Sequence, residues 1–243
     1  MRVVRVDSEA ADVADISGAT QLVGLIGWPV THSLSPQMQN AAFAAAGLDW
    51  VYVPLPTPPE RVDEALRGIV ALGFRGANVT APHKLAAGRL SETEDGLDSV
   101  NTLVVDDGRL LGSSTDPAVL STLPAERPVI VGDGGSARAF RAALTNARSF
   151  SRRGDWPPDV SGADLIVHAT PVRDEVLFEA AAGQTLVDLP YPETATAVAA
   201  RAAGAIVIGG LDVLVAQGAA SFERWTGLAA PVDVMRAAVG LPS

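Results

Sequence analysis

Short apolar runs that alternate with helix-like stretches constrain the fold of this chain more than any other feature of its sequence. Residues 21–27 (QLVGLIG), 50–55 (WVYVPL) and 75–79 (RGANV) read as strands, with helix patterns over 31–47 and 59–73 between them. Strands that follow one another through helices pair in parallel, because the helix carries the chain back to the starting edge of the sheet. The first half of the sequence therefore predicts an α/β unit built around a parallel sheet.

Local signals mark the ends of the first predicted helix, and a hairpin follows the third strand. Ser35 is a natural N-cap, Pro36 fits the first turn and Gly47 can end the helix. Residues 101–112 contain an Asp-Gly pair between apolar residues, which is typical of a tight β-hairpin turn. We expect this hairpin to be an appendage of the first sheet.

A second alternation of strands and helices begins near residue 124. Residues 127–144 read as a strand, a glycine turn and a helix, and strand patterns follow over 164–171 and 185–190. The tail is helical, with a break at Pro231. The sequence thus predicts an α/β fold of two lobes, with a cleft between them where a ligand can bind.

Composition narrows the possible partners. Acidic residues outnumber basic ones by 28 to 18, and the net charge of −10 disfavours nucleic acid and anionic membranes, which are bound by clustered Lys and Arg. Because the chain has no cysteine, disulfides and thiolate metal sites are excluded, and no metal site is expected. No apolar run approaches the roughly 18 residues of a membrane span, and the first residues lack the apolar core of a signal peptide. We expect a cytoplasmic monomer or homodimer whose partner is a small molecule.

The glycine turn of the second lobe indicates a dinucleotide site. Gly132, Gly134 and Ala137 form a G-x-G-x-x-A pattern that follows a strand and opens a helix, where backbone N–H groups can bind a pyrophosphate. About 20 residues further on, an NAD site carries an acidic residue for the ribose. This chain has Arg152 and Arg153 there, and paired guanidinium groups suit the 2′-phosphate of NADP. NADP is therefore favoured over NAD, although a plain tight turn and two surface arginines remain the alternative.

Lys84 lies just beyond a predicted strand, where α/β sheets place their ligands. Asn78 and Thr80 interrupt this otherwise apolar strand, and Asp116 follows further along the chain. An ammonium group paired with a carboxylate can give a proton to a ketone oxygen as a hydride arrives. We predict Lys84 as the acid/base and Asp116 as its partner, with a solvated surface lysine as the alternative.

A series of motifs, taken in order, resembles the shikimate dehydrogenase family. The resemblance covers roughly residues 22–240 and implies reversible, NADP-dependent reduction of 3-dehydroshikimate to shikimate in the pathway through chorismate to the aromatic amino acids. The motifs are GWPVTHSLSP, NVTAPHK, SVNT, GSSTD, GDGGSARA, DLPY and GGLDVLVAQGAASFERWTG.

The resemblance also implies domains and residue roles. It implies Lys84 as the catalytic lysine and Asp116 as its partner. The implied substrate-binding residues are Ser33, Ser35, Asn78, Thr80, Asn101, Asp116, Tyr191 and Gln217, with the two serines on the carboxylate. The implied cofactor-binding residues are Gly132, Gly134, Gly135, Ser136 and Ala137 at the diphosphate and Ser151, Arg152 and Arg153 near the adenosine. The expected divisions are a loose leader over 1–20, a substrate domain over 21–117 completed by helices over 213–243, and a shortened Rossmann-like NADP domain over 118–212.

The departures from the family pattern gather in the second lobe. Asp133 replaces a small residue, Ser151 replaces Asn and Arg153 replaces Thr, while the segment over 138–164 is shorter than expected. Two alternatives follow. One is a quinate/shikimate or aminoshikimate dehydrogenase with the same fold, and the other is a shikimate-binding module with weakened cofactor binding.

Overall fold

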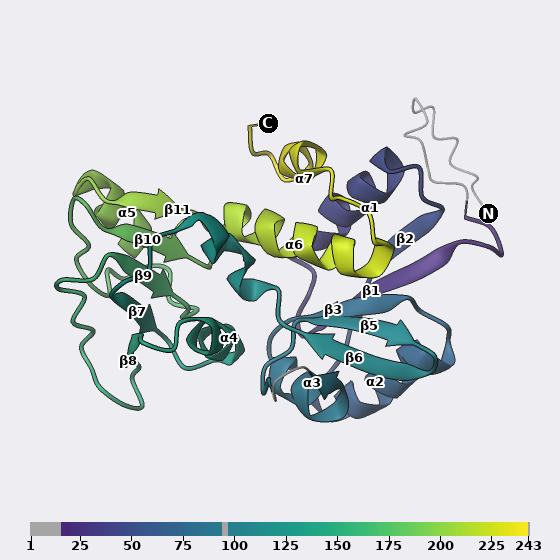
Figure 1. Ribbon diagram of the computed structural model, residues 1–243. Coiled ribbons are helices and arrows are strands. Elements are labelled where there is room, and N and C mark those ends of the chain that lie inside the picture. The colour runs from purple at the N-terminus through teal and green to yellow at the C-terminus, as the bar shows by residue number, and fades with distance from the viewer. Residues whose placement is uncertain (1–15, 94–96, 243) are drawn as a thin grey trace, which may run out of the picture.

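The computed structural model describes residues 16–93 and 97–242 and shows two α/β lobes side by side (Figure 1). One lobe is built on a six-stranded sheet and the other on a five-stranded sheet. The predicted fold class, α/β with two lobes, is confirmed. Of the expected leader over 1–20, residues 1–15 lie outside the described residues.

The first lobe is a mixed sheet with its own helices. Its elements are β1 (Gln21–Gly27), α1 (Ser35–Ala45), β2 (Trp50–Pro56), η1 (Pro59–Arg61), α2 (Val62–Ala71), β3 (Gly76–Val79), α3 (Lys84–Leu90), β4 (Glu92–Thr93), β5 (Thr102–Asp106) and β6 (Arg109–Ser113). The strand order is β2-β1-β3-β5-β6-β4, with β1, β2 and β3 parallel and β5 antiparallel to β3. The predicted hairpin is confirmed, since β5 and β6 are joined by Asp107 and Gly108 at φ of 49° and 77°.

The start of α1 differs from the expectation. The helix begins at Ser35 itself, and Leu34 is the N-cap residue, with no side-chain cap. The backbone N–H of Ser35 is bound by the hydroxyl oxygen of Ser33, 3.2 Å away, so the turn before the helix is closed by Ser33. Ser35 was therefore wrongly predicted as the N-cap, whereas Pro36 does lie in the first turn.

The second lobe is a parallel sheet. Its elements are β7 (Pro128–Val131), α4 (Gly135–Ala143), β8 (Arg148–Phe150), β9 (Leu165–His168), β10 (Thr185–Asp188), α5 (Ala195–Ala202) and β11 (Ile206–Ile208). The strand order is β11-β10-β9-β7-β8, and every pairing is parallel. Residues 151–164 join β8 to β9 without a helix, in the segment that the sequence predicts to be shortened.

Two connections join the lobes. The 3₁₀ helix η3 (Asp116–Thr122) leads from β6 to β7, and α6 (Gly210–Thr226) runs from the second lobe across the first, as Figure 1 shows. At its far end, Nε1 of Trp225 donates to the carbonyl oxygen of Leu103 (2.9 Å). After the predicted break at Pro231, α7 (Val232–Ala238) packs beside α1. The C-terminal helices therefore lie against the first lobe although they follow the second in sequence.

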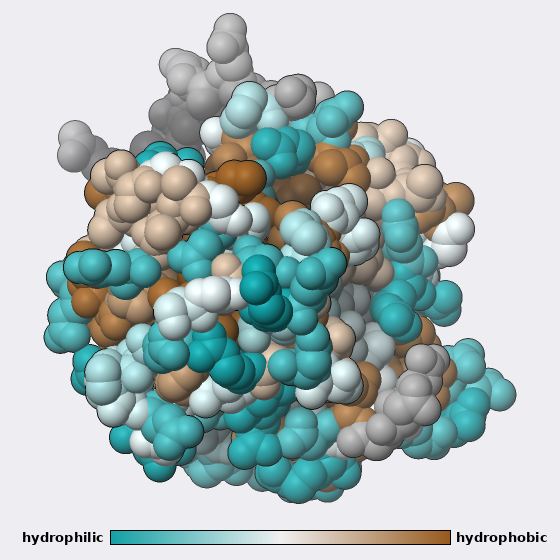
Figure 2. Space-filling view, turned by 60° about the vertical axis from the view of Figure 1, so that its left-hand side comes forward, coloured by the Kyte–Doolittle hydropathy of each residue, from teal (hydrophilic) through white to brown (hydrophobic). Residues whose placement is uncertain are grey.

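Hydrophilic and hydrophobic residues are both present on the surface. On the face shown in Figure 2, hydrophilic residues dominate and hydrophobic residues form separate patches. Within the described part of the chain, no helix combines the length and the hydropathy that a bilayer span requires.

The close packing of α6 on the first sheet depends on Gly76 in β3. A Cβ at Gly76 would strike the carbonyl oxygen of Leu103 and the indole of Trp225. We expect Gly76→Ala to lower the free energy of unfolding by about 1–3 kcal/mol, because α6 would be pushed off the sheet. As a control, Gly68 in α2 has open space around it, and Gly68→Ala should raise stability by about 0.5–1 kcal/mol. Urea unfolding of both variants checks this, and equal effects of the two would contradict it.

Candidate active site

A cleft with a volume of about 160 Å³ lies between the two lobes, beside the first turns of α6. The cleft brings together the predicted catalytic and substrate-binding residues: Ser33, Ser35, Asn78, Thr80, Lys84, Asn101, Asp116, Tyr191 and Gln217.

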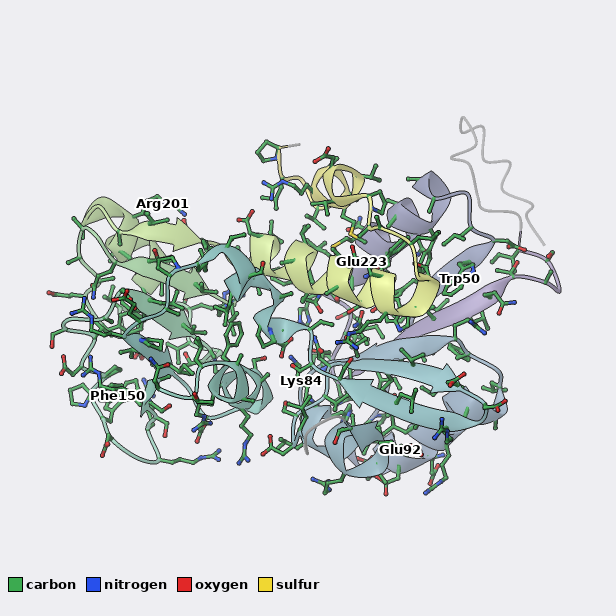
Figure 3. The ribbon with its side chains drawn as sticks, viewed as in Figure 1. Trp50, Lys84, Glu92, Phe150, Arg201 and Glu223 are labelled. Carbon is green, nitrogen blue, oxygen red and sulfur yellow. The ribbon has the colours of Figure 1, made fainter. Side chains whose placement is uncertain are left out.

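Lys84 and Asp116 form an ion pair in this cleft. Nζ of Lys84 lies 2.5 Å from Oδ2 of Asp116 and 3.0 Å from Oγ of Ser136. Each residue is fixed at the start of a helix, Lys84 in α3 and Asp116 in η3. Both side chains are only 11% exposed, so Lys84, the only lysine in the sequence, is not a solvated surface charge. Figure 3 shows Lys84 at the level where the two lobes meet.

The carboxylate of Asp116 has a different donor at each oxygen. Its Oδ2 accepts from Lys84, and its Oδ1 accepts from Nδ2 of Asn101 (2.8 Å). The amide of Asn101 is itself held, because its Oδ1 accepts from the backbone N–H of Thr115 (2.7 Å). The carboxylate therefore cannot rotate without breaking a buried hydrogen bond, and Nζ of Lys84 keeps its direction.

A neutral tyrosine, Tyr52, fixes the side chain of Asn78, which lies next to Asn101. Burial raises the pKa of Tyr52 far above its usual value, so its hydroxyl stays protonated and donates to Oδ1 of Asn78 (2.9 Å). This leaves Nδ2 of Asn78 to face three acceptors. They are the carbonyl of Asn101 (3.1 Å), Oγ1 of Thr102 (3.2 Å) and Oγ of Ser221 (3.0 Å). The amide orientation of Asn78 thus follows from the buried phenol.

Two serine hydroxyls lie at the N-terminal end of α1. The Oγ atoms of Ser33 and Ser35 are 3.2 Å apart and both residues line the cleft. Hydroxyls beside the free N–H groups of a helix start suit a carboxylate, which also gains from the helix dipole. Tyr191 of the second lobe and Gln217 of α6 line the same cleft.

The glycine turn approaches both the second sheet and the ion pair. Gly132 has φ of 136°, and a Cβ there would lie 2.6 Å from the carbonyl oxygen of Ala169. A Cβ at Gly135, the first residue of α4, would lie 2.9 Å from Cβ of Lys84. Beside Gly134 the space is open. The turn therefore has the shape of a phosphate cradle, with the start of α4 directed at the cleft.

A second pocket, with a volume of about 300 Å³, lies beside this turn. It brings together Ser151, Arg152 and Arg153 with Gly132, as predicted for the adenosine side of a dinucleotide site, while Ser136 lines the cleft and Ala137 is fully buried in α4. The remaining lining residues are Asp133, Trp156, Thr170, Pro171, Val172 and Leu177.

Each of the two arginines lies beside a carboxylate. Nη2 of Arg152 is 3.0 Å from Oε2 of Glu175, and its guanidinium lies 5.4 Å from the ring centre of Trp156. Nε of Arg153 is 3.6 Å from Oδ2 of Asp133, so the negative charge inside the turn is partly offset. The arginine side chains are 60% and 87% exposed, and solvent therefore screens both pairs.

A buried hydrogen-bond network around His168 reaches the wall of the same pocket. Nδ1 of His168 lies 2.6 Å from Oδ1 of Asp188, and its Nε2 lies 2.7 Å from Oγ1 of Thr170. Asp188 also accepts from the hydroxyl of Thr194 (3.1 Å), the N-cap of α5. His168 and Asp188 are fully buried, so the network joins the ends of β9 and β10 to the pocket wall at Thr170.

The residues predicted from the sequence do not include the apolar residues that line the cleft or Ser221, which is bonded to Asn78. Phe140 in α4, Leu189 after β10, and Val213 and Leu214 in α6 line the cleft, but as apolar residues they carry no chemical signal. Ser221 was detectable, because it lies one helical turn after Gln217 on an otherwise apolar face.

Comparisons with known proteins agree on one family. The family model for the shikimate dehydrogenase substrate binding domain matches residues 25–103, and that for the shikimate 5'-dehydrogenase C-terminal domain matches residues 210–239. An NADP(+) shikimate dehydrogenase of Anaeromyxobacter dehalogenans is 42% identical over 91% of this chain and 97% of the relative. That alignment has 271 positions against the 243 residues of this chain, so the relative contains segments that are absent here.

Solved structures give the same result. The shikimate dehydrogenase from Aquifex aeolicus matches with a TM-score of 0.84 at 31% identity, over 93% of this chain and 99% of the other. The shikimate 5-dehydrogenase from Thermus thermophilus, in complex with NADP(H) and shikimate, matches with a TM-score of 0.79 at 29% identity, over 90% of this chain and 98% of the other.

The Tyr52–Asn78 arrangement predicts the effect of a one-atom change. In Asn78→Asp the new oxygen would face the carbonyl of Asn101, and the buried charge would have no donor from that group. We expect the free energy of unfolding to fall by about 2–4 kcal/mol. The matched control is Asn146→Asp at an exposed position, with an expected loss below about 1 kcal/mol. Denaturant unfolding of the two variants is the measurement, and a loss for Asn78→Asp no larger than the control's would refute this description of the amide.

Proposed function

The chain belongs to the shikimate dehydrogenase family, and from this premise we propose that it catalyses the reversible, NADP-dependent reduction of 3-dehydroshikimate to shikimate. The observation that carries the proposal is the Lys84–Asp116 pair, which lies in a cleft shared by the first lobe, α6 and the start of α4. We assign substrate binding to residues 21–117 with the helices over 213–243, and cofactor binding to residues 118–212.

In this proposal, the substrate carboxylate binds Ser33 and Ser35 at the start of α1. Neutral hydroxyls and helix N–H groups can hold an anion without a basic patch, which is compatible with a net charge of −10. Amide, hydroxyl and carboxylate groups of the cleft bind the ring hydroxyls, and Tyr191 and Gln217 close the site. The residues proposed to bind the ring hydroxyls are Asn78, Thr80, Asn101 and Asp116.

The open cradle of the glycine turn and the pocket beside it fit NADP. The turn would hold the diphosphate, and Ser151, Arg152 and Arg153 would surround the adenosine 2′-phosphate. When bound, NADP supplies the hydride-transfer chemistry. The apolar wall of Phe140, Leu189 and neighbouring residues would keep water away from the reacting carbon.

Lys84 handles the proton in this mechanism. In the direction of reduction, its Nζ donates a proton to the ketone oxygen, and in the reverse direction it takes the proton from the hydroxyl. Asp116 aims Nζ through Oδ2, while Asn101 prevents the carboxylate from turning. Ser136 holds Nζ from the cofactor side, so both lobes contribute to the position of the lysine.

Removal of the ammonium group tests this role. Lys84→Ala should lower kcat by about 10²–10⁴-fold, since a positioned acid/base contributes about that much, while binding of shikimate changes far less. Arg89→Ala is the matched control, because Arg89 is an exposed cation of the same helix, α3. The measurements are kcat from NADPH absorbance and the shikimate Kd by calorimetry. Equal losses in kcat and binding, or no loss, would remove Lys84 from the mechanism.

A substrate and cofactor panel tests the reaction itself. We expect shikimate with NADP to give the highest kcat/KM, and quinate at least about tenfold less, because a polar group without a partner in the site is costly to bury. Faster turnover of quinate would favour the broader dehydrogenase. Shikimate binding without binding of NADPH or NADH at millimolar concentration would favour a binding module.

A further inference from the structure

Outside the cleft, the carboxylate of Glu175 lies beside the guanidinium of Arg152, and the proposed function gives this contact no role. Glu175 lies in the segment between β9 and β10, and its Oε2 is 3.0 Å from Nη2 of Arg152. The backbone around it is anchored, since the hydroxyl of Thr196, a fully buried residue of α5, donates to the carbonyl of Glu175 (3.2 Å). The same hydroxyl oxygen accepts from the backbone N–H of Leu177 (3.0 Å). These two bonds fix the backbone at a place from which the carboxylate of Glu175 reaches Arg152.

Arg152 is held from two sides without any ligand. Glu175 binds one nitrogen of its guanidinium, and the ring of Trp156 lies 5.4 Å from its central carbon. The aromatic contact positions the cation but leaves its charge intact. The carboxylate contact positions it and also partly offsets its charge, because an opposite charge lies within hydrogen-bonding distance.

We propose that Glu175 is a specificity-determining residue that weakens the preference for NADP over NAD. The inference rests on the proposed function, because it takes Arg152 as the residue that binds the 2′-phosphate. A 2′-phosphate must share or displace the carboxylate on Arg152, and the two anions repel each other. NAD has a 2′-hydroxyl in the same place, which can donate a hydrogen bond to a carboxylate, as in sites that select NAD. Glu175 thus weakens the binding of NADP and leaves the binding of NAD largely unaffected.

The exposure of the pair sets the size of the effect. The two side chains are 60% and 64% exposed, so solvent and salt screen their interaction. Removing the charge of Glu175 should tighten binding of a 2′-phosphate by about fivefold at low salt, in line with exposed charge pairs.

The experiment compares Glu175→Gln with Glu179→Gln. Glutamine can still accept a hydrogen bond from Arg152, so the variant removes the charge and keeps the contact. Glu179 is an exposed glutamate of the same segment that lines other pockets, so its variant has the same change in net charge. The probes are 2′,5′-ADP and 5′-AMP, which differ in the 2′-phosphate, and the readout is Kd by calorimetry on the full chain.

Glu175→Gln is expected to tighten 2′,5′-ADP about fivefold at low salt, with 5′-AMP and the Glu179→Gln variant unchanged. The gain should shrink as salt is raised. Unchanged discrimination between the two probes in Glu175→Gln, in a chain where Arg152→Ala still weakens 2′,5′-ADP, would overturn the role of Glu175 alone. If Arg152→Ala leaves 2′,5′-ADP unaffected, the assignment of Arg152 in the proposed function fails instead.

Discussion

The Lys84–Asp116 ion pair can lie inside the cleft because every atom that carries its charge has a partner. Two charges that leave water lose hydration, and the loss is recovered when their remaining donors and acceptors are bonded. Here Oδ1 of Asp116 is bonded to Asn101, and Nζ of Lys84 is also bonded to Ser136. The chain of hydrogen bonds continues through Asn78 to Tyr52, whose phenol is kept neutral by burial. The direction of the lysine is thus fixed by residues well below the cleft surface.

The close contact between the lobes gives Gly135 a different role from the other glycines of its motif. A side chain at Gly135 would collide with Lys84, so the start of α4 can approach the ion pair only without a Cβ. The hydroxyl of Ser99 in the first lobe donates to the carbonyl of Gly135 (2.8 Å), which holds the same approach. In consequence, one end of α4 borders the glycine turn and Lys84 together, and the position of one depends on the other.

Local features were predictable from the sequence, whereas contacts between distant segments were not. The strand and helix alternation, the hairpin at Asp107 and the glycine turn depend on neighbouring residues, so the sequence contains their signals. The N-cap prediction at Ser35 failed because Ser33, two residues earlier, closes the turn instead. The Tyr52–Asn78 bond depends on the pairing of strands, and Glu175 reaches Arg152 through a long loop. No pattern within a short window indicates such contacts.

The charge of the molecule explains why its local donors matter. A chain with a net charge of −10 repels anions at long range, so shikimate and a phosphorylated nucleotide gain nothing from the overall field. In the proposed function, binding comes from short-range groups: the serine hydroxyls and helix N–H groups in the cleft, and the guanidinium groups in the second pocket. Hydroxyls and N–H groups cannot be neutralised by a neighbouring carboxylate, but guanidinium groups can. For this reason we infer that the substrate side tolerates an acidic surface, while the cofactor side is sensitive to a single glutamate beside Arg152.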